Sequence, residues 1–479
     1  MSTGLKPVGA ETLSELRKLL GPGGYLDTAA DLEPFLTDHR GLYRGASPLV
    51  ALPSSTAQVA GVVGLCAAAG VGIVPHGGNT SYCGGATPRE SGAEIVLSLR
   101  RMKRVRTVDA LNYSMTVEAG CVLADVQRAA ESADRLFPMS LGSEGSCTIG
   151  GNLSTNAGGT AVLRYGMMRD LVLGLEVVLP DGRVLGQLQS LRKDNTGYDL
   201  KQLFIGAEGT LGVITAACLK LFPRPRGHAT ALIALRSPQA AVELLASLRG
   251  ALGDSVTSFE LIPRSALQLV CRHIDGAVDP FDQSHDWYVL LEVSLPQLDS
   301  DLTERLQAQL AAGMERGILL DVAFAASLAQ RQAFWKLRES IPEAQARAGA
   351  SLKHDISVPT QELPAFIEQG ARVLEELVPK GRLVAYGHLG DGNLHFNLGC
   401  PENMDAATFL GRASEARGAI NELVAAHRGS FSAEHGIGRY KVAELERYED
   451  PVALGMMRQI KDLLDPSGIM NPGKVLARE

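Results

Sequence analysis

The first part of the chain alternates short apolar runs with polar, glycine-rich segments. An apolar run follows Pro53-Ser54-Ser55-Thr56, a typical helix start, and predicts a buried helix over residues 59–69. Short runs of apolar residues predict strands over 71–75, 95–99, 114–118 and 173–179. The connector Phe222-Pro223-Arg224-Pro225-Arg226 is stiff and charged, so we place a domain boundary at residue 225.

The second part of the chain has fewer glycines and a different pattern. Apolar runs predict strands over 231–235, 287–293 and 321–324, and amphipathic periodicity predicts helices over 240–252, 302–313 and 328–338. This β-α-β alternation is typical of a ferredoxin-like or related α+β domain. A last helix is expected over 451–464, followed by a turn-rich tail over 465–473.

Composition and charge exclude several classes of protein. The chain carries 46 Lys and Arg against 53 Asp and Glu, a net charge of −7, which argues against a dedicated nucleic-acid binder. The basic cluster over residues 100–106 is then a solvated turn or a patch that docks a protein partner. Seven scattered cysteines without a CxxC pair indicate neither a thiolate zinc site nor a disulfide framework.

No segment is predicted to direct the chain to a membrane. The N-terminal residues lack the apolar core of a signal peptide. The longest apolar run, residues 59–74, is shorter than the ~20 residues that span a bilayer. We therefore expect a cytoplasmic protein without a membrane span.

Glycine is the compositional excess, with 52 of 479 residues against a usual ~7%. Two clusters hold many of these glycines: residues 75–85, directly after a predicted strand, and residues 142–159, where they alternate with Ser, Thr and Asn. A glycine loop after a strand leaves backbone N–H groups free to point at an anion and lets a phosphate approach closely. Tight turns explain either cluster alone, whereas the two together favour a long polar ligand. No G-x-G-x-x-G is present, so the dinucleotide-binding Rossmann fingerprint is absent.

These segments resemble the FAD-binding domain of the vanillyl-alcohol oxidase / p-cresol methylhydroxylase flavoproteins. The matching motifs are residues 75–85, 145–152, 156–159, 192–200 and 204–212. His76 could be tethered to the flavin, but the resemblance favours non-covalent FAD. It implies FAD contacts at Pro75, Gly77, Gly78, Asn79, Thr80, Ser81, Gly85, Leu141, Gly142, Gly145, Thr148, Ile149, Gly151, Asn152, Ala157, Gly158, Gly159, Gly209, Ile214 and Asn471.

Histidines and a carboxylate near the C-terminus form a second constellation. Residues 386–395 hold His388 and His395 in a glycine-rich turn, which can curl so that both imidazoles converge. Further on, Glu434 directly precedes His435. Two histidines and one carboxylate with an open position are the ligands of a catalytic divalent metal, zinc-like or manganese-like. Alone, this spacing is a weak signal.

Both segments resemble the metal-site motifs of D-2-hydroxyglutarate and related D-lactate dehydrogenases within the same flavoprotein family. The resemblance implies a divalent metal, with Zn favoured, on His388, His395 and Glu434, and His435 as catalytic base and substrate contact. Other branches of the superfamily lack the metal, so the presence of the full set is informative.

The same resemblance implies substrate contacts at Arg338, Lys353 and Asn397. Arg338 can bind a carboxylate with two N–H groups, and Lys353 supplies a point charge. From the residues alone, surface charges on a helix and at a strand start are the favoured interpretation of both cations. The D-2-hydroxyglutarate branch can carry Thr four residues after the arginine, where this chain has Pro342. This departure leaves the acyl chain of the substrate open.

The resemblance implies an α+β protein with three parts. The first is a two-subdomain FAD-binding domain of the vanillyl-alcohol oxidase type (1–225), and the second is a ferredoxin-like substrate or cap domain with the metal loop (226–430). The third is a small helical C-terminal segment that returns to the FAD site (431–479).

The activity that the resemblance implies is metal-dependent oxidation of a D-2-hydroxy acid, D-2-hydroxyglutarate or D-malate, with hydride transfer to FAD. The alternatives are a D-lactate or glycolate dehydrogenase, or a zinc- and flavin-binding module without chemistry. Expected partners are the small hydroxy acid and an electron-transferring flavoprotein or other electron carrier; a homodimer is compatible with the resemblance.

Overall fold

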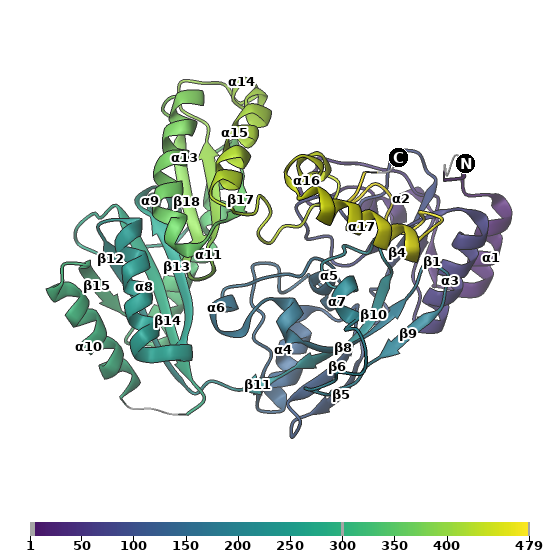
Figure 1. The fold of residues 1–479 in the computed structure, drawn as a ribbon, viewed down its shortest axis with the longest axis horizontal. Helices are drawn as coiled ribbons and strands as arrows, with labels where there is room; N and C mark the ends of the chain where they lie inside the picture. The colour runs from purple at the N-terminus through teal and green to yellow at the C-terminus, as the bar shows by residue number, and fades with distance from the viewer. Residues whose placement is uncertain (1–4, 298–300, 478–479) are drawn as a thin grey trace. The chain divides into compact units, whose positions relative to one another are not determined.

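The computed structural model describes residues 5–297 and 301–477, which form two compact units (Figure 1). Unit 1 comprises the chain up to Gly159, Gly166–Arg224 and the part from Glu434 onward. Unit 2 comprises Pro225–Ala433 and the short segment Thr160–Tyr165. The chain therefore leaves unit 1, builds unit 2 and returns to unit 1.

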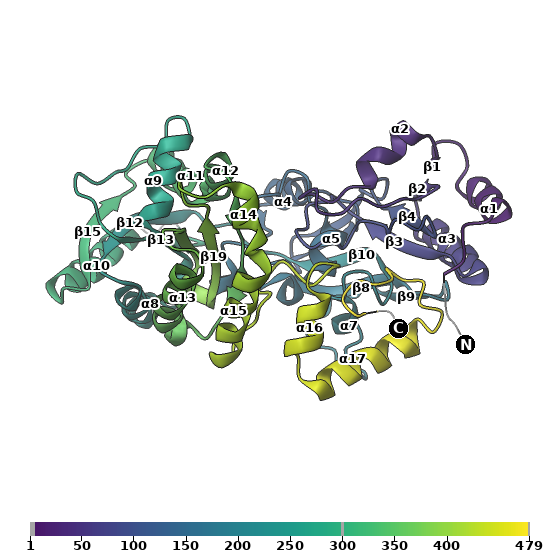
Figure 2. The ribbon, with the colours of Figure 1, turned by 90° about the horizontal axis from the view of Figure 1, so that it is seen from above.

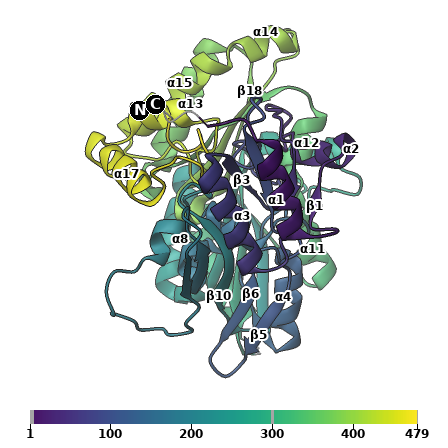
Figure 3. The same ribbon diagram turned by 90° about the vertical axis from the view of Figure 1, so that its right-hand side faces the viewer.

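One sheet of unit 1 is mostly parallel and has the strand order β1-β2-β4-β3 (Tyr25–Leu26, Val50–Ala51, Glu94–Ser98 and Gly72–His76). Helix α3 (Thr56–Ala69) leads into β3 and lies beside α1 (Ala10–Leu20), as Figure 3 shows. Ser55 caps α3 by accepting a hydrogen bond from the Gln58 backbone N–H, and Gly70 ends the helix in the left-handed conformation. The helix that the apolar run predicts is confirmed.

A second, antiparallel sheet of unit 1 has the order β5-β6-β10-β8-β9 (Val105–Asp109, Ser114–Glu118, Val213–Lys220, Val172–Val178 and Val184–Gln187). Helices α4 (Leu123–Ser132) and α5 (Ile149–Ser154) lie between β6 and β8 in the chain. The two sheets give unit 1 the two-subdomain layout that the resemblance implies.

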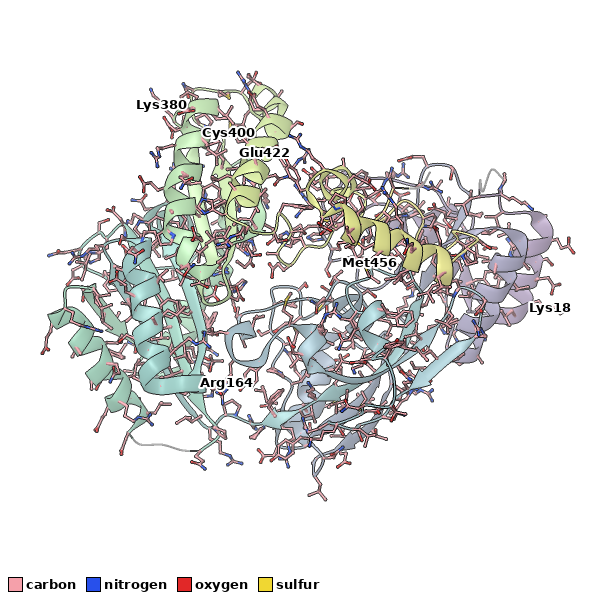
Figure 4. All side chains as sticks on the ribbon, in the orientation of Figure 1. Lys18, Arg164, Lys380, Cys400, Glu422 and Met456 are labelled. Carbon is pink, nitrogen blue, oxygen red and sulfur yellow. The ribbon has the colours of Figure 1, made fainter. Side chains whose placement is uncertain are left out.

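The C-terminal segment packs onto the first sheet of unit 1. It contains α16 (Val442–Tyr448) and α17 (Pro451–Leu464), where Met456 lies on an exposed position (Figure 4). Beyond α17, Met470 pairs with Ile73 of β3, whose backbone N–H donates to Ile469 and whose carbonyl accepts from Asn471. The tail thereby reaches the strand that precedes the first glycine cluster.

Unit 2 contains the ferredoxin-like arrangement that the sequence predicts. Strands β12 (Gly227–Leu235), β13 (Val256–Pro263), β14 (Trp287–Leu295) and β15 (Leu319–Phe324) have the antiparallel order β15-β12-β14-β13. Helix α8 (Pro238–Leu252) connects β12 to β13, and α10 (Leu302–Glu315) connects β14 to β15. The sequence does not predict β13, because Thr257, Ser258 and Glu260 interrupt its apolar residues, although the strand is buried along its whole length.

A hairpin extends this sheet beyond β13. It is formed by β18 (Arg382–His388) and β19 (Asn393–Gly399), with the short strands β16 (Ser351–Leu352) and β17 (Asp355–Ser357) paired to β19. Helices α13 (Leu363–Leu377) and α15 (Ala413–Ala426) pack together beside the hairpin (Figure 2). Helices α11 (Leu328–Glu339) and α12 (Ile341–Arg347) contribute to a separate apolar core that includes Tyr386.

The remaining elements are mostly short; α9 is the exception, with apolar residues in the core that includes Tyr386. They are α2 (Ala29–Leu32), η1 (Glu33–Phe35), β7 (Arg135–Leu136), α6 (Val162–Tyr165), η2 (Met168–Leu171), α7 (Lys201–Phe204), β11 (Phe222–Pro223), η3 (Gly253–Ser255), α9 (Arg264–His273), η4 (Thr360–Glu362), η5 (Leu389–Asp391) and α14 (Ala406–Gly411). Arg164 of α6, labelled in Figure 4, donates to the carbonyl and hydroxyl oxygens of Ser294 at 2.7 and 2.9 Å, which joins this segment to unit 2.

Candidate active site

The loop that follows β3 in unit 1 offers unused backbone donors. Within the described residues, no atom accepts a hydrogen bond from the backbone N–H groups of residues 77–81. The loop turns through left-handed conformations at Asn79 (φ 53°) and Gly84 (φ 67°), and the Asn79 side chain fixes it by donating to the Thr37 carbonyl at 2.9 Å. A curved row of free N–H groups is suited to binding an anion such as a phosphate.

The two glycine clusters of the sequence lie against each other in unit 1. A Cβ atom at Gly77 would lie 2.5 Å from the Thr148 hydroxyl, and one at Gly78 would lie 2.2 Å from the Ser146 carbonyl oxygen. Neither distance allows a side chain, so close approach of the two segments requires glycine. Thr148 also caps α5, its hydroxyl accepting from the Gly151 N–H at 3.4 Å.

The other predicted FAD residues occupy the same region of unit 1. Leu141, Gly142 and Gly145 lie in the turn before α5; Ile149, Gly151 and Asn152 belong to α5; Ala157, Gly158 and Gly159 follow it; Ile214 is buried in β10.

Asn471 of the tail joins two of these segments. Its Nδ2 group donates to the Gly85 carbonyl at 2.9 Å and to the Glu208 carbonyl at 2.7 Å. Its Oδ1 atom is buried without a hydrogen-bond partner among the described residues. A Cβ at Gly209 would lie 2.9 Å from the Pro75 ring. The free donors of the loop and this unsatisfied acceptor fit a large polar cofactor, because buried polar groups are normally paired.

His76 is the last residue of β3 and is buried. Its ring lies 5.0 Å from the Phe35 ring, and neither ring nitrogen has a hydrogen-bond partner among the described residues. Burial lowers the pKa of His76 to about 4, so the imidazole is neutral at pH 7.

In unit 2, His388 and His395 lie on one face of the β18–β19 hairpin. Tyr386 pairs directly with His395, and His388 lies two residues beyond Tyr386 on the same strand, so the two histidines are diagonal neighbours. Their ring centroids are 5.9 Å apart. The imidazoles therefore converge as expected, but through strand pairing: the glycine turn only closes the hairpin, with Gly392 in the left-handed conformation (φ 84°).

Glu260 of β13 connects two of the predicted site residues. Its Oε1 atom lies 2.8 Å from His388 Nδ1, and its Oε2 atom accepts from Arg338 Nε at 2.7 Å. Burial alone would raise the pKa of this carboxyl, but the charges of His388 and Arg338 hold it well below its ordinary value. Glu260 was not among the residues predicted from the sequence, although a lone carboxylate among the uncharged residues 256–263 is a recognisable signal.

Arg338 is not a surface charge. Only 6% of it is exposed, and its guanidinium lies 4.9 Å from the centroid of the Tyr386 ring. It projects from α11 onto the sheet face that carries His388, while Pro342 is the second residue of the next helix, α12. Lys353, between β16 and β17, is exposed as the surface interpretation expects.

Asn397 and Asp355 complete this face of unit 2. Asn397 is buried two residues beyond His395 on β19; its Nδ2 donates to Gln345 Oε1 at 3.1 Å and its Oδ1 accepts from the His354 N–H. Asp355 pairs with His395 across β17 and β19, and its Oδ1 lies 4.0 Å from His395 Nδ1. Asp355 was not among the residues predicted from the sequence, although it stands two residues after Lys353.

Glu434 and His435 begin the last segment of unit 1. Glu434 Oε1 lies 3.6 Å from His435 Nε2, and the His435 ring lies 4.6 Å from the ring of Tyr82, which belongs to the first glycine cluster. The structure thus brings His388, His395, Arg338 and Asn397 together within unit 2, and places Glu434 and His435 beside the glycine loop of unit 1. Imidazoles, carboxylates and a buried guanidinium are the groups that bind a metal, transfer a proton and hold an anionic substrate.

Comparison with known families agrees with these features. The chain matches the family model described as "FAD linked oxidases, C-terminal domain" over residues 224–475 and the "FAD binding domain" model over residues 47–186. In the described residues, no helix combines the length and apolar content needed to cross a bilayer.

Similar whole proteins carry one recurring name. The chain is 37% identical to the mitochondrial D-2-hydroxyglutarate dehydrogenase of Arabidopsis thaliana, over 98% of this chain and 82% of the relative. It is 36% identical to a D-2-hydroxyglutarate dehydrogenase of Xanthomonas citri pv. viticola, over 93% of both chains. The solved structure of p-cresol methylhydroxylase superposes with a TM-score of 0.76 at 16% identity, covering 99% of each chain, and shows the shared fold.

Proposed function

Since the chain belongs to the FAD-dependent D-2-hydroxy acid dehydrogenases of the vanillyl-alcohol oxidase / p-cresol methylhydroxylase family, we propose that its substrate is a D-2-hydroxy dicarboxylate, D-2-hydroxyglutarate above D-malate. The class of reaction is FAD-linked oxidation of a D-2-hydroxy acid. The proposal adds the substrate, a divalent metal and the roles of individual residues.

One observation carries the choice of a dicarboxylate. Arg338 is a buried cation on the sheet face that also holds His388 and His395. Glu260 accepts from its Nε and holds the guanidinium on this face, and guanidinium groups are well suited to binding carboxylates. A distal carboxylate on Arg338 would leave the hydroxyl end of the substrate for the histidines. Lys353 and Asn397 are proposed to hold the remaining polar groups of the substrate.

His388, His395 and Glu434 are the residues proposed to hold a divalent metal, most simply Zn. The donor types fit: the Glu260 carboxylate engages His388 Nδ1, so Nε2 is the atom proposed as the ligand, and a carboxylate behind a metal-binding imidazole is the usual arrangement. When bound, the metal would supply a Lewis acid that stabilises negative charge on the substrate's oxygens.

His435 is the residue proposed to take the proton of the 2-hydroxyl group. Its ring packs beside Tyr82 of the loop 77–85, next to the residues predicted to hold FAD, so the base and the cofactor would face the same carbon. FAD supplies the acceptor for the hydride from C2. The residues of this chain bind and orient the acid and hold its proton, and the product is a 2-oxo acid.

Reduced FAD must pass two electrons to an acceptor before the next turnover. We propose an electron-transferring flavoprotein or a similar protein carrier in this role. Reoxidation by such a carrier at a rate far above that by oxygen would support the proposal, and equal rates would overturn it.

The substrate is tested by initial rates with an artificial dye acceptor over a panel of D-2-hydroxy acids. The panel pairs dicarboxylates (2-hydroxyglutarate and malate) with monocarboxylates (lactate and glycolate). The proposal predicts kcat/KM at least about 10-fold higher for D-2-hydroxyglutarate than for D-lactate, because a charged hydrogen bond is worth about 1.5–3 kcal/mol. The reverse order would identify a D-lactate or glycolate dehydrogenase, in agreement with Pro342.

A further inference from the structure

The backbone that follows His435 is held by a buried carboxylate of unit 1. Glu208 Oε1 accepts the Ile437 N–H at 2.7 Å, and Oε2 accepts the Gly438 N–H at 2.9 Å. Burial raises the pKa of Glu208 to about 7, against the lowering effect of these two backbone N–H groups. Two consecutive N–H groups on one carboxyl group fix the direction of the chain. Of Glu208 itself, 8% is exposed.

Glu208 is itself fixed from several sides. Its backbone N–H donates to the Ser154 carbonyl at the end of α5, and its carbonyl accepts from Asn471 Nδ2, each at 2.7 Å. It adopts a left-handed conformation (φ 51°), which is uncommon for a side chain of this size and is retained where surrounding contacts demand it. The carboxylate therefore projects from a rigid position between two segments predicted to bind FAD.

The first glycine cluster holds the same segment from another side. The rings of Tyr82 and His435 lie 4.6 Å apart at an interplanar angle of 49°, and Tyr82 meets the His39 ring edge-on at 5.6 Å. Cys83 Sγ donates to the Gly436 carbonyl at 3.3 Å. A Cβ at Gly438 would lie 2.2 Å from the Cys83 carbonyl oxygen, so the two segments are in close contact.

We propose that Tyr82 and Glu208 are positioning residues: Tyr82 sets the orientation of the His435 imidazole by ring packing, and Glu208 fixes the backbone of the segment 434–438. The inference rests on the proposed function for the role of His435. Because Tyr82 belongs to the loop 77–85, the same loop would order both FAD and the proton acceptor.

Substitutions separate the contribution of the Tyr82 ring from that of the Glu208 carboxyl group. Tyr82→Phe keeps the ring and removes the hydroxyl, whereas Tyr82→Leu removes the ring. Glu208→Gln keeps the size of the side chain, but its NH2 group faces one of the two backbone N–H donors, so one hydrogen bond is lost. Tyr25→Leu and Glu118→Gln are matched controls, because Tyr25 lies in β1 and Glu118 is a buried carboxylate bonded to Arg104.

The experiment measures flavin reduction in single turnover without oxygen, with D-2-hydroxyglutarate and the FAD-loaded protein. Tyr82→Leu and Glu208→Gln should each slow reduction about 10-fold or more with FAD content unchanged, because small misplacement of a catalytic group costs up to about 100-fold. Tyr82→Phe and both controls should stay within about twofold of the wild-type rate. A wild-type rate in Tyr82→Leu would overturn the role of Tyr82.

A second readout does not depend on activity. Glu208→Gln should increase amide hydrogen exchange in peptides covering residues 434–440, and Glu118→Gln should not. Unchanged exchange there would overturn the role of Glu208 even if the rate falls. His435→Ala separates this inference from the proposed function: if that variant reduces flavin normally, His435 is not the base, whereas the exchange experiment still decides whether Glu208 holds the segment.

Discussion

The carboxylate of Glu260 lies opposite His388 across strands β13 and β18, with 2.8 Å between Glu260 Oε1 and His388 Nδ1. The second oxygen of the same carboxylate accepts from Arg338. One buried acid therefore orients both a proposed metal ligand and a proposed substrate anchor, so these two functions are coupled through a single side chain.

Glu260→Gln should weaken metal binding about 10- to 100-fold, the usual effect of removing the carboxylate behind a metal-binding histidine. The amide can no longer balance the charge of Arg338, so KM for the substrate should rise as well. Bound zinc after dialysis against a graded chelator measures the first effect. Glu292→Gln is the matched control, because Glu292 is a buried carboxylate of the neighbouring strand that bonds Arg331. Equal metal loss in both variants would contradict the role of Glu260.

Arg338→Lys should lower kcat/KM for D-2-hydroxyglutarate about 10- to 100-fold, since loss of a charged hydrogen bond costs about 1.5–3 kcal/mol. The lysine keeps the charge but loses the planar fork that binds a carboxylate with two N–H groups. Activity on D-lactate, which has no distal carboxylate, should fall much less. Lys336→Gln, on the exposed side of the same helix, serves as control. An equal loss with both acids would assign Arg338 to a purely structural role.

The sequence could predict the elements whose signals are local. The helix at 56–69, the strand at 114–118 and the helix at 451–464 follow from capping residues, β-branched runs and periodicity. The ferredoxin-like class of unit 2 follows from the alternation of β12, β14 and β15 with helices, whereas β13 and the strand order do not.

Other features depend on contacts between distant segments. Strand β13 is buried on both faces, but polar residues interrupt its apolar run, so neither the strand nor Glu260 was predicted. Spacing along the chain says nothing of the hairpin register that places Tyr386 opposite His395. The burial of Arg338 depends on the pairing of its helix with Glu260, 78 positions away.

Gly78→Ala should abolish or strongly weaken FAD binding, because the new Cβ would lie 2.2 Å from the Ser146 carbonyl oxygen and would push the two glycine segments apart. FAD affinity is measured by reconstituting the apoprotein with the cofactor. Gly186→Ala in β9 is the control, because a Cβ there meets no atom within 4 Å. If Gly78→Ala binds FAD as tightly as the wild type, the loop does not hold the cofactor closely.

Lys474 gives the stability of the protein a specific pH dependence. Its ammonium is buried and lies 3.8 Å from Glu94, which is also bonded by Arg89. Burial lowers the pKa of Lys474 to about 8. The carboxylates of Glu94 and Glu90 act to raise this pKa, and the nearby cations Arg89 and Arg439 act to lower it. The unfolded chain therefore holds this proton more tightly, and stability should rise as pH increases from about 8 toward 10.5.

Lys474→Met removes this group and leaves Glu94 paired with Arg89. The variant should exceed the wild type by up to about 3 kcal/mol in the free energy of unfolding at pH 7, and the difference should shrink as pH rises through 9. Denaturation midpoints of both proteins at several pH values measure it. A difference that stays constant with pH would show that Lys474 does not titrate in this range.

The central claim is tested most directly by the visible spectrum of the FAD-loaded protein under anaerobic conditions after D-2-hydroxyglutarate is added. The account predicts that the flavin bleaches and that one equivalent of the 2-oxo acid forms. It also predicts that prior removal of metal slows bleaching at least about 10-fold and that zinc restores it. A flavin that remains oxidised with every D-2-hydroxy acid of the panel would contradict the account.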